Sequence, residues 1–318
     1  MRNILEGIKF VADNSTHVHI DMNRLEEKVL KFDSDKIQSW RDVAPFPVPT
    51  LENDQKVAFV MILDSLNFCY WGNPKWTIDY NGKDLDGSFG LMGCMYRALE
   101  DNIPILDPNF LEHMTVNDAK YIFKGNTNIP LFNDRLKILN EIGRNINKKY
   151  DGSFTKLVEK SDKDVFKLLT NIVEVFPSFN DVSRYKRREI QFYKRAQLAI
   201  LDIYDEFHGS GIGEFYNINK LTACAEYKIP QILRKLGILQ YDLNLSQKVD
   251  NKIELPKDNA EEIEIRANMV WTIELMKNRL VKRYPNITSA IIDNYLWVMS
   301  QDKSPSDKPY HLTRTIAY

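Results

Sequence analysis

Apolar residues recur at intervals of three and four along most of this chain, and this spacing is the strongest constraint on its fold. An α-helix with one buried face has that periodicity, whereas a half-buried strand alternates at every second residue. Residues 57–67 and 89–100 follow the helical spacing, and the second half of the chain follows it almost throughout. The sequence therefore predicts a mainly α-helical fold.

The composition is that of a soluble globular protein. The chain has 318 residues, of which 43% are hydrophobic and 27% charged, so it can bury a full core. Its longest apolar run, residues 57–63, is far shorter than the roughly 20 residues that cross a membrane. We therefore expect no membrane partner.

Cysteine content and net charge narrow the function classes further. Cys69, Cys94 and Cys224 are widely spaced and odd in number, which argues against a disulfide framework and a Cys-rich zinc site. The N-terminal segment carries charges and lacks the apolar core of a signal peptide. These features predict a cytoplasmic protein. The net charge of −1 gives no broad attraction for duplex DNA, so we expect no direct nucleic-acid partner.

One β-hairpin interrupts the helical pattern in the first half. Residues 76–80 and 83–85 are separated by Asn81-Gly82. This pair favours the tight type I′ turn that joins two antiparallel strands. The sequence therefore predicts a small hairpin between two helices.

The second half is expected to be wholly helical. The spacing predicts helices over residues 190–207, from Asn217 or Asn219 through Ala225, and over 231–235, 261–284 and 286–299. Pro230 must end or kink the helix before it, because proline disfavours helical geometry in the preceding residue. A compact α-helical domain with one small β-hairpin accounts for these patterns.

Three polar residues stand out against the helical pattern. Gln197 falls on the apolar stripe of residues 190–207, where its amide must find hydrogen-bond partners. Glu226 precedes a helix start, where free N–H groups favour its ionised form. Asp293 adjoins an apolar face. Spacing alone favours a structural role for Gln197 and Glu226, and it leaves Asp293 open between a pocket and the solvent.

Two further patterns have plain structural explanations. His17 and His19 would share one face of a strand, but no third ligand follows at metal-binding spacing. Residues 209–213 are rich in glycine like a phosphate-binding loop, yet they lack the preceding strand and the following Lys-Ser/Thr. We expect no metal and no cofactor, and a helix–helix turn at these glycines.

Eight short motifs occur in a fixed order along almost the whole chain. They are Asn67-Phe-Cys-Tyr-Trp71, Gly87-Ser-Phe-Gly-Leu91 after the hairpin, Pro130-Leu-Phe-Asn-Asp-Arg135, Phe192-Tyr-Lys-Arg-Ala-Gln197, Tyr227-Lys-Ile-Pro-Gln231, Glu264-Ile-Arg266, Asp293-Asn-Tyr-Leu-Trp297 and His311-Leu-Thr-Arg-Thr-Ile-Ala-Tyr318. Their order and spacing resemble the queuosine salvage proteins, which are queuosine 5′-phosphate N-glycosylase/hydrolases. The resemblance implies a single α-helical domain over residues 1–318, related in shape to helix–hairpin–helix DNA glycosylases.

The resemblance also implies an activity and a set of site residues. Family members hydrolyse the N-glycosidic bond of queuosine 5′-monophosphate and release queuine for reinsertion into tRNA. The family's acid lies two residues before the Lys/Arg-Ile/Leu-Pro-Gln run, and here that position is Glu226. Lys194 is the first candidate for the 5′-phosphate and Arg195 the second, and the reaction centre is expected at Glu226 and Lys194. Asp293 retains the family's acid for the cyclopentenediol of queuine.

This sequence departs from the family pattern at three positions of the expected base site. Cys224 stands where the family usually has a stacking phenylalanine, Asn294 replaces a usual tyrosine, and Val298 replaces a second usual acid. We still expect base contacts from Cys224 and Asn294. The departures motivate an alternative function, a divergent member that binds a modified nucleotide with weak or altered activity. A DNA glycosylase would share the architecture, but the net charge of −1 counts against it.

Overall fold

The protein is described by a computed structural model covering residues 4–45, 50–302, 304 and 306–318. Its helices are α1 (Ile4–Asn14), α2 (Met22–Leu30), α3 (Asn53–Ser65), α4 (Gly87–Glu100), α5 (Pro108–His113), α6 (Val116–Ile122), α7 (Phe132–Tyr150), α8 (Phe154–Glu159), α9 (Val165–Val175), α10 (Lys194–Glu206), α11 (Lys228–Lys235), α12 (Leu243–Asp250), α13 (Ala260–Leu280) and α14 (Ser289–Met299). The strands are β1 (Val18–Ile20), β2 (Thr77–Tyr80), β3 (Lys83–Asp86), β4 (Val182–Tyr185), β5 (Arg188–Gln191) and β6 (Leu239–Tyr241). The mainly α-helical fold is confirmed.

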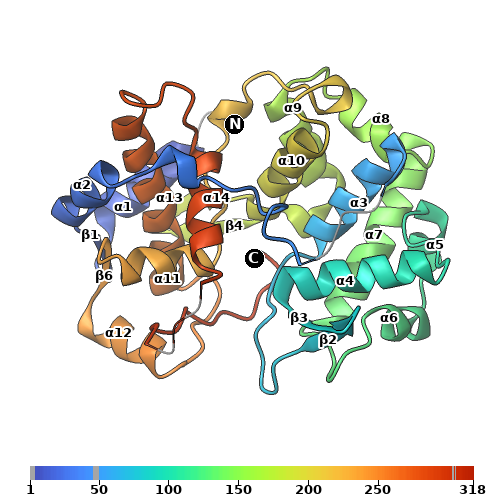
Figure 1. Ribbon diagram of the computed structural model, residues 1–318, viewed down its shortest axis with the longest axis horizontal. Coiled ribbons are helices and arrows are strands. Elements are labelled where there is room, and N and C mark those ends of the chain that lie inside the picture. Colours follow the sequence, from blue (N-terminus) through green and yellow to red (C-terminus); the bar gives the residue numbers. More distant parts are fainter. Residues whose placement is uncertain (1–3, 46–49, 303, 305) are drawn as a thin grey trace.

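The helices form two groups with the C-terminus between them (Figure 1). In one group, α13 packs on α1, α2 and α14, and α11 packs on α13 and α14. In the other, α3 packs on α7, α8 and α10. The long helix α13 is buried along most of its length, so it forms the centre of its group. The principal hydrophobic cluster contains residues of both groups, so the groups share one core.

The predicted hairpin is confirmed. β2 and β3 pair antiparallel from Thr77 with Asp86 to Tyr80 with Lys83. Asn81 and Gly82 both have positive φ angles, 53° and 71°, as a type I′ turn requires. The hairpin leads directly into α4, whose first residues are Gly87, Ser88 and Phe89.

The prediction of a wholly helical second half is wrong at residues 182–191. β4 and β5 form a second hairpin there, and β1 pairs with the distant β6. The turn between β4 and β5 is formed by Lys186 and Arg187, both with positive φ and neither a typical turn residue. α10 therefore begins at Lys194 rather than near residue 190.

The helix predicted from Asn217 or Asn219 through Ala225 is also wrong. Only a short 3₁₀ turn, Ile218–Lys220, forms there, and no helix or strand is assigned from Leu221 to Ala225. Pro230 does not end a helix but lies in the first turn of α11, where its missing N–H costs no helical hydrogen bond. No helix within the described ranges has the length and apolarity that a membrane crossing requires.

Candidate active site

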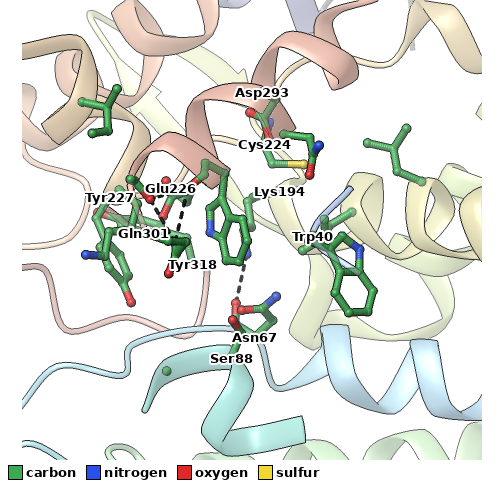
Figure 2. Close-up of a pocket in the computed structure, with 18 of the residues that line it drawn as sticks. Trp40, Asn67, Ser88, Lys194, Cys224, Glu226, Tyr227, Asp293, Gln301 and Tyr318 are labelled. Carbon is green, nitrogen blue, oxygen red and sulfur yellow. Dashed lines mark hydrogen bonds between the residues drawn. The ribbon is translucent and has the colours of Figure 1, made fainter. Parts of the chain in front are cut away.

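A cavity of about 740 Å³ opens between the two helix groups. Its lining comes from residues far apart in the sequence, including α4, α10, α11, α14 and residues 37–40. Aromatic side chains supply much of its apolar surface, namely those of Trp40, Phe68, Tyr70, Phe89, Tyr204, Tyr227, Trp297, Tyr310 and Tyr318. Figure 2 shows Glu226, Lys194, Cys224 and Asp293 near one another, with Asn67 and Ser88 below them and Trp40 to one side. A cavity of this size and polarity can hold a nucleotide-sized ligand.

Glu226 lies at the entry to α11 and is held by the start of that helix. Its Oε1 accepts a hydrogen bond of 2.5 Å from the backbone N–H of Ile229, and the N–H of Lys228 also donates to the carboxyl group. Burial raises the pKa of Glu226, while these two N–H groups and the charge of Lys194 partly oppose that rise. The site therefore presents a fixed, buried carboxyl group whose ionised form receives helix N–H donors.

Lys194 is the first residue of α10 and lies against the same cavity. The residue is only 5% exposed, and its Nζ donates to the backbone oxygen of Asn67 at 3.1 Å (Figure 2). Its positive charge lowers the pKa values of Glu226 and Asp293, which places it electrostatically beside both acids. The structure thus brings together the two residues that the sequence placed at the reaction centre.

Arg195 does not reach the cavity, so its predicted phosphate contact is not supported. Arg195 is 1% exposed, and its guanidinium group donates to the backbone oxygens of Ser65 and Ser178. It also lies over the rings of Phe68 and Phe179. Because successive helical residues point about 100° apart, Lys194 faces the cavity while Arg195 faces the core.

Asp293 and Cys224 form the part of the cavity wall next to Glu226. Asp293 Oδ1 accepts a 3.0 Å hydrogen bond from the backbone N–H of Cys224, which ties α14 to the segment before α11. Burial and then the charge of Glu226 raise the pKa of Asp293 well above its usual range. Two nearby carboxyl groups of this kind favour one protonated and one ionised partner.

The other two substituted positions differ in location. Asn294 lines the cavity, and its Nδ2 donates to the backbone oxygen of Gln38, which fixes the segment that carries Trp40. Val298 does not line this cavity, whereas Cys224 and Asn294 do.

Sequence reasoning missed the buried ion pair that positions both Glu226 and Lys194. Arg266 donates to Asp181 at 3.1 and 2.6 Å, and to the backbone oxygen of Ala225, the residue before Glu226, at 3.3 and 3.2 Å. Asp181 Oδ2 also accepts from the backbone N–H of Lys194 at 3.2 Å. Arg266 belonged to one of the eight motifs, but nothing in the sequence marked Asp181 as its partner.

Gln197 has the structural role that spacing favoured. Its Nε2 donates to the oxygens of Phe192 and Thr222, and its Oε1 accepts from the Thr222 N–H at 2.9 Å. Within the described part of the chain, no group of three or more His, Cys, Asp or Glu residues could hold a metal ion. His17 instead lies 2.7 Å from Asp242, through its Nδ1.

Comparisons with a family model and with curated proteins point to the same family. A family model described as "Queuosine salvage protein" matches residues 48–318. Three of the most similar curated relatives are named queuosine 5′-phosphate N-glycosylase/hydrolase. That of Sphaerobacter thermophilus is 37% identical and covers 82% of this chain and 80% of its own length. Those of Bos taurus and Mus musculus are 34% and 32% identical, and each alignment covers 98% of both chains.

Proposed function

Because this chain belongs to the queuosine salvage protein family, we propose that it hydrolyses the N-glycosidic bond of queuosine 5′-monophosphate within this cavity, with Glu226 beside the ribose. The relatives are named for this reaction, which is the hydrolysis of an N-glycosyl bond, so the chain is classed as a hydrolase. The observation that carries the assignment of residues is the Glu226 carboxyl group, which helix N–H donors fix at the wall of a nucleotide-sized cavity.

Hydrolysis breaks the bond between C1′ and the base nitrogen, and the electron pair leaves with the base. Water adds its oxygen to C1′, and one of its protons ends on the released queuine. As the bond breaks, the ribose gains oxocarbenium character, which a nearby carboxylate stabilises. Glu226 in its ionised form would supply that charge and orient the attacking water.

Lys194 is proposed to bind the 5′-phosphate, and this gives a kinetic prediction. Lys194→Ala should raise KM for queuosine 5′-phosphate and leave KM for queuosine nearly unchanged, because only the nucleotide carries the phosphate. Steady-state assays with both substrates make the comparison. Lys308→Ala removes a cavity-lining lysine that is paired with Asp250, and it serves as the control. An equal rise in KM for both substrates would show that Lys194 does not bind the phosphate.

Asp293, Asn294 and Cys224 are proposed to contact the base. The second carboxyl oxygen of Asp293 would meet the hydroxyl groups of the base side chain, since its first oxygen is held by Cys224. Cys224 lines the cavity with a side chain too small to stack on a ring.

Cys224→Phe is therefore expected to strengthen queuine binding by roughly 1 kcal/mol, the low end of the range for base stacking on an aromatic ring. Queuine titrations and thermal melts of both proteins measure the effect. Weaker binding with a lower melting temperature would show that a neighbour fills this space, because an added ring overpacks a filled site.

The broader predictions are proposed on the same basis. We propose one domain over residues 1–318, supported by the hydrophobic cluster shared by both helix groups. We also propose an architecture related to helix–hairpin–helix DNA glycosylases, a cytoplasmic location and a small-molecule nucleotide as the only substrate class, without direct nucleic-acid binding. The near-neutral net charge supports the last point.

The direct test is incubation of the purified protein with queuosine 5′-phosphate and chromatographic detection of free queuine. Release of queuine that is proportional to enzyme and time supports the proposal. Binding of the nucleotide without release would instead assign the alternative, a member that binds a modified nucleotide without cleaving it. Release of bases from duplex DNA would favour a DNA glycosylase.

A further inference from the structure

A buried carboxyl group, Asp202, lines the cavity away from the Glu226 end and takes no part in the proposed reaction. Asp202 lies on α10, eight residues after Lys194, which at a rise of about 1.5 Å per residue places the two roughly 12 Å apart along the helix axis. Its side chain is only 7% exposed. A carboxylate buried this deeply needs a compensating positive charge or several hydrogen-bond donors.

Two groups fix this carboxyl group in place. Trp40 donates its indole N–H to Asp202 Oδ1 at 3.2 Å. Asp64, which is fully buried behind it, shares a carboxyl–carboxyl hydrogen bond with Asp202. Such a bond requires one proton between the two groups, and Asp64 Oδ2 is buried without a hydrogen-bond donor among the described residues.

The shared proton resides on Asp64, so Asp202 carries the negative charge. Burial and then the charge of Asp202 raise the pKa of Asp64 well above its usual range. Burial and the nearby Asp205 also raise the pKa of Asp202, but Arg41 and the hydrogen bonds with Trp40 and Asp64 oppose that rise, which favours Asp202 as the ionised partner. Two hydrogen-bond donors thus aim an ionised carboxylate at the cavity.

No lysine, arginine or histidine among the described residues forms an ion pair with Asp202. Arg41, whose charge lowers the pKa of Asp202, is itself paired with Glu206 at 2.6 Å. Asp205 also lines this end of the cavity. A buried carboxylate with two hydrogen-bond donors but no ion-pair partner favours a ligand that brings a cation.

We propose that Asp202 binds the protonated secondary amine in the side chain of the queuosine base, as the counter-ion that the chain itself does not provide. This inference rests on the proposed function, because that function identifies the ligand. The base side chain is an organic ammonium with neighbouring hydroxyl groups, and Asp202 lies about two helical turns along α10 from Lys194, the residue proposed for the 5′-phosphate. Asp202 would thereby distinguish queuine from 7-deazapurines without a charged side chain.

The test is calorimetric titration of two free bases, queuine and 7-deazaguanine, which lacks the charged side chain. Asp202→Asn should weaken queuine binding by about 10-fold or more, because it removes one partner of a buried charge pair. It should leave 7-deazaguanine binding unchanged. Asp205→Asn, an acid one turn further along α10 at the same cavity, is the matched control and should keep the preference for queuine.

Three results would overturn the inference. Asp202→Asn could lose affinity equally for both bases, or lose affinity for neither, or Asp205→Asn could show the same selective loss of queuine affinity. If Asp202→Asn does not fold, Trp40→Phe keeps an aromatic ring and removes only the N–H that fixes Asp202. That variant should show a smaller loss that is still confined to queuine, and an unchanged preference would count against Asp202.

The titration uses the free base, so its outcome does not depend on bond cleavage. A parental protein that releases queuine while Asp202→Asn binds it as tightly as before overturns only the role of Asp202. A parental protein that neither cleaves the nucleotide nor binds queuine overturns the proposed function together with this inference.

Discussion

Glu226→Gln is expected to lower the turnover of queuosine 5′-phosphate by at least ~100-fold, the usual scale for losing a positioned charge in a transition state. Glutamine can still accept the hydrogen bond from Ile229 through its amide oxygen, so the start of α11 should keep its structure. What the variant loses is the negative charge beside the ribose. Single-turnover rates at saturating substrate measure this effect apart from binding.

Glu261→Gln is a suitable control for that experiment. Glu261 is 6% exposed and Glu226 is 9% exposed, but Glu261 pairs with Lys248 and does not line the cavity. The turnover of Glu261→Gln should stay at the parental level. A parental rate in Glu226→Gln would remove Glu226 from the mechanism.

The pH profile provides a second readout for Glu226. Because burial raises its pKa, activity that requires the ionised form should fall as the pH is lowered through that raised pKa. Glu226→Gln cannot titrate, so its residual activity should lose this step. Glu226→Asp tests geometry, because it keeps the charge and shortens the side chain. Activity below that of the parental protein would show that the cavity is shaped for glutamate.

Asp181→Ala is expected to lower the free energy of unfolding by about 3–5 kcal/mol, because it removes one partner of a fully buried ion pair. Among the described residues, the Arg266 guanidinium would keep only Glu262, at 3.5 Å, and the Ala225 oxygen as ionic or hydrogen-bond partners. The rings of Phe192 and Tyr318 lie over that guanidinium group, so solvent does not replace the lost partner readily. Denaturant unfolding followed by circular dichroism gives the value.

An exposed ion pair provides the comparison. Asp13 pairs with Lys9 on the surface of α1, where both side chains are about half exposed, at 53% and 51%. Asp13→Ala should change stability by less than about 1 kcal/mol. An equally small change in Asp181→Ala would mean that the buried pair contributes no net stability. Since Asp181 also holds the Lys194 N–H, we expect Asp181→Ala to lose activity even where it remains folded.

The two hairpins show what the sequence could and could not predict. The pair Asn81-Gly82 predicts a type I′ turn, because both residues adopt positive φ angles at little cost in free energy. Lys186 and Arg187 adopt similar angles without such a preference. The second hairpin must be stabilised by its tertiary surroundings, and Tyr185, for example, bonds to Glu264 on α13. A local pattern cannot report contacts of that kind.

The segment before Glu226 was predicted as a helix for a related reason. Its backbone groups find partners on distant side chains: Thr222 on Gln197, Cys224 on Asp293 and Ala225 on Arg266. These bonds replace the helical ladder that the local spacing suggested. Gln197 was recognised as a buried amide, but its partner segment could not be identified from spacing.

The candidate site divides in the same way. The family motifs identified five residues that the structure brings to one cavity: Glu226, Lys194, Cys224, Asp293 and Asn294. Arg195 was placed there because it adjoins Lys194 in a motif, whereas helical geometry turns it into the core. Asp202 escaped notice because its distinction depends on Asp64 and Trp40, which only folding brings near it.

The position of the cavity between two helix groups has a consequence for dynamics. Ser88 belongs to α4, which lies on the side of the group that contains α3, and Trp297 belongs to α14 in the other group, yet both line the same cavity (Figure 1). A bound nucleotide would act as a non-covalent cross-link between α4 and α14, which are far apart in the sequence. Amide hydrogen exchange should therefore slow on both sides of the cavity at once, because local opening of either side would expel the ligand.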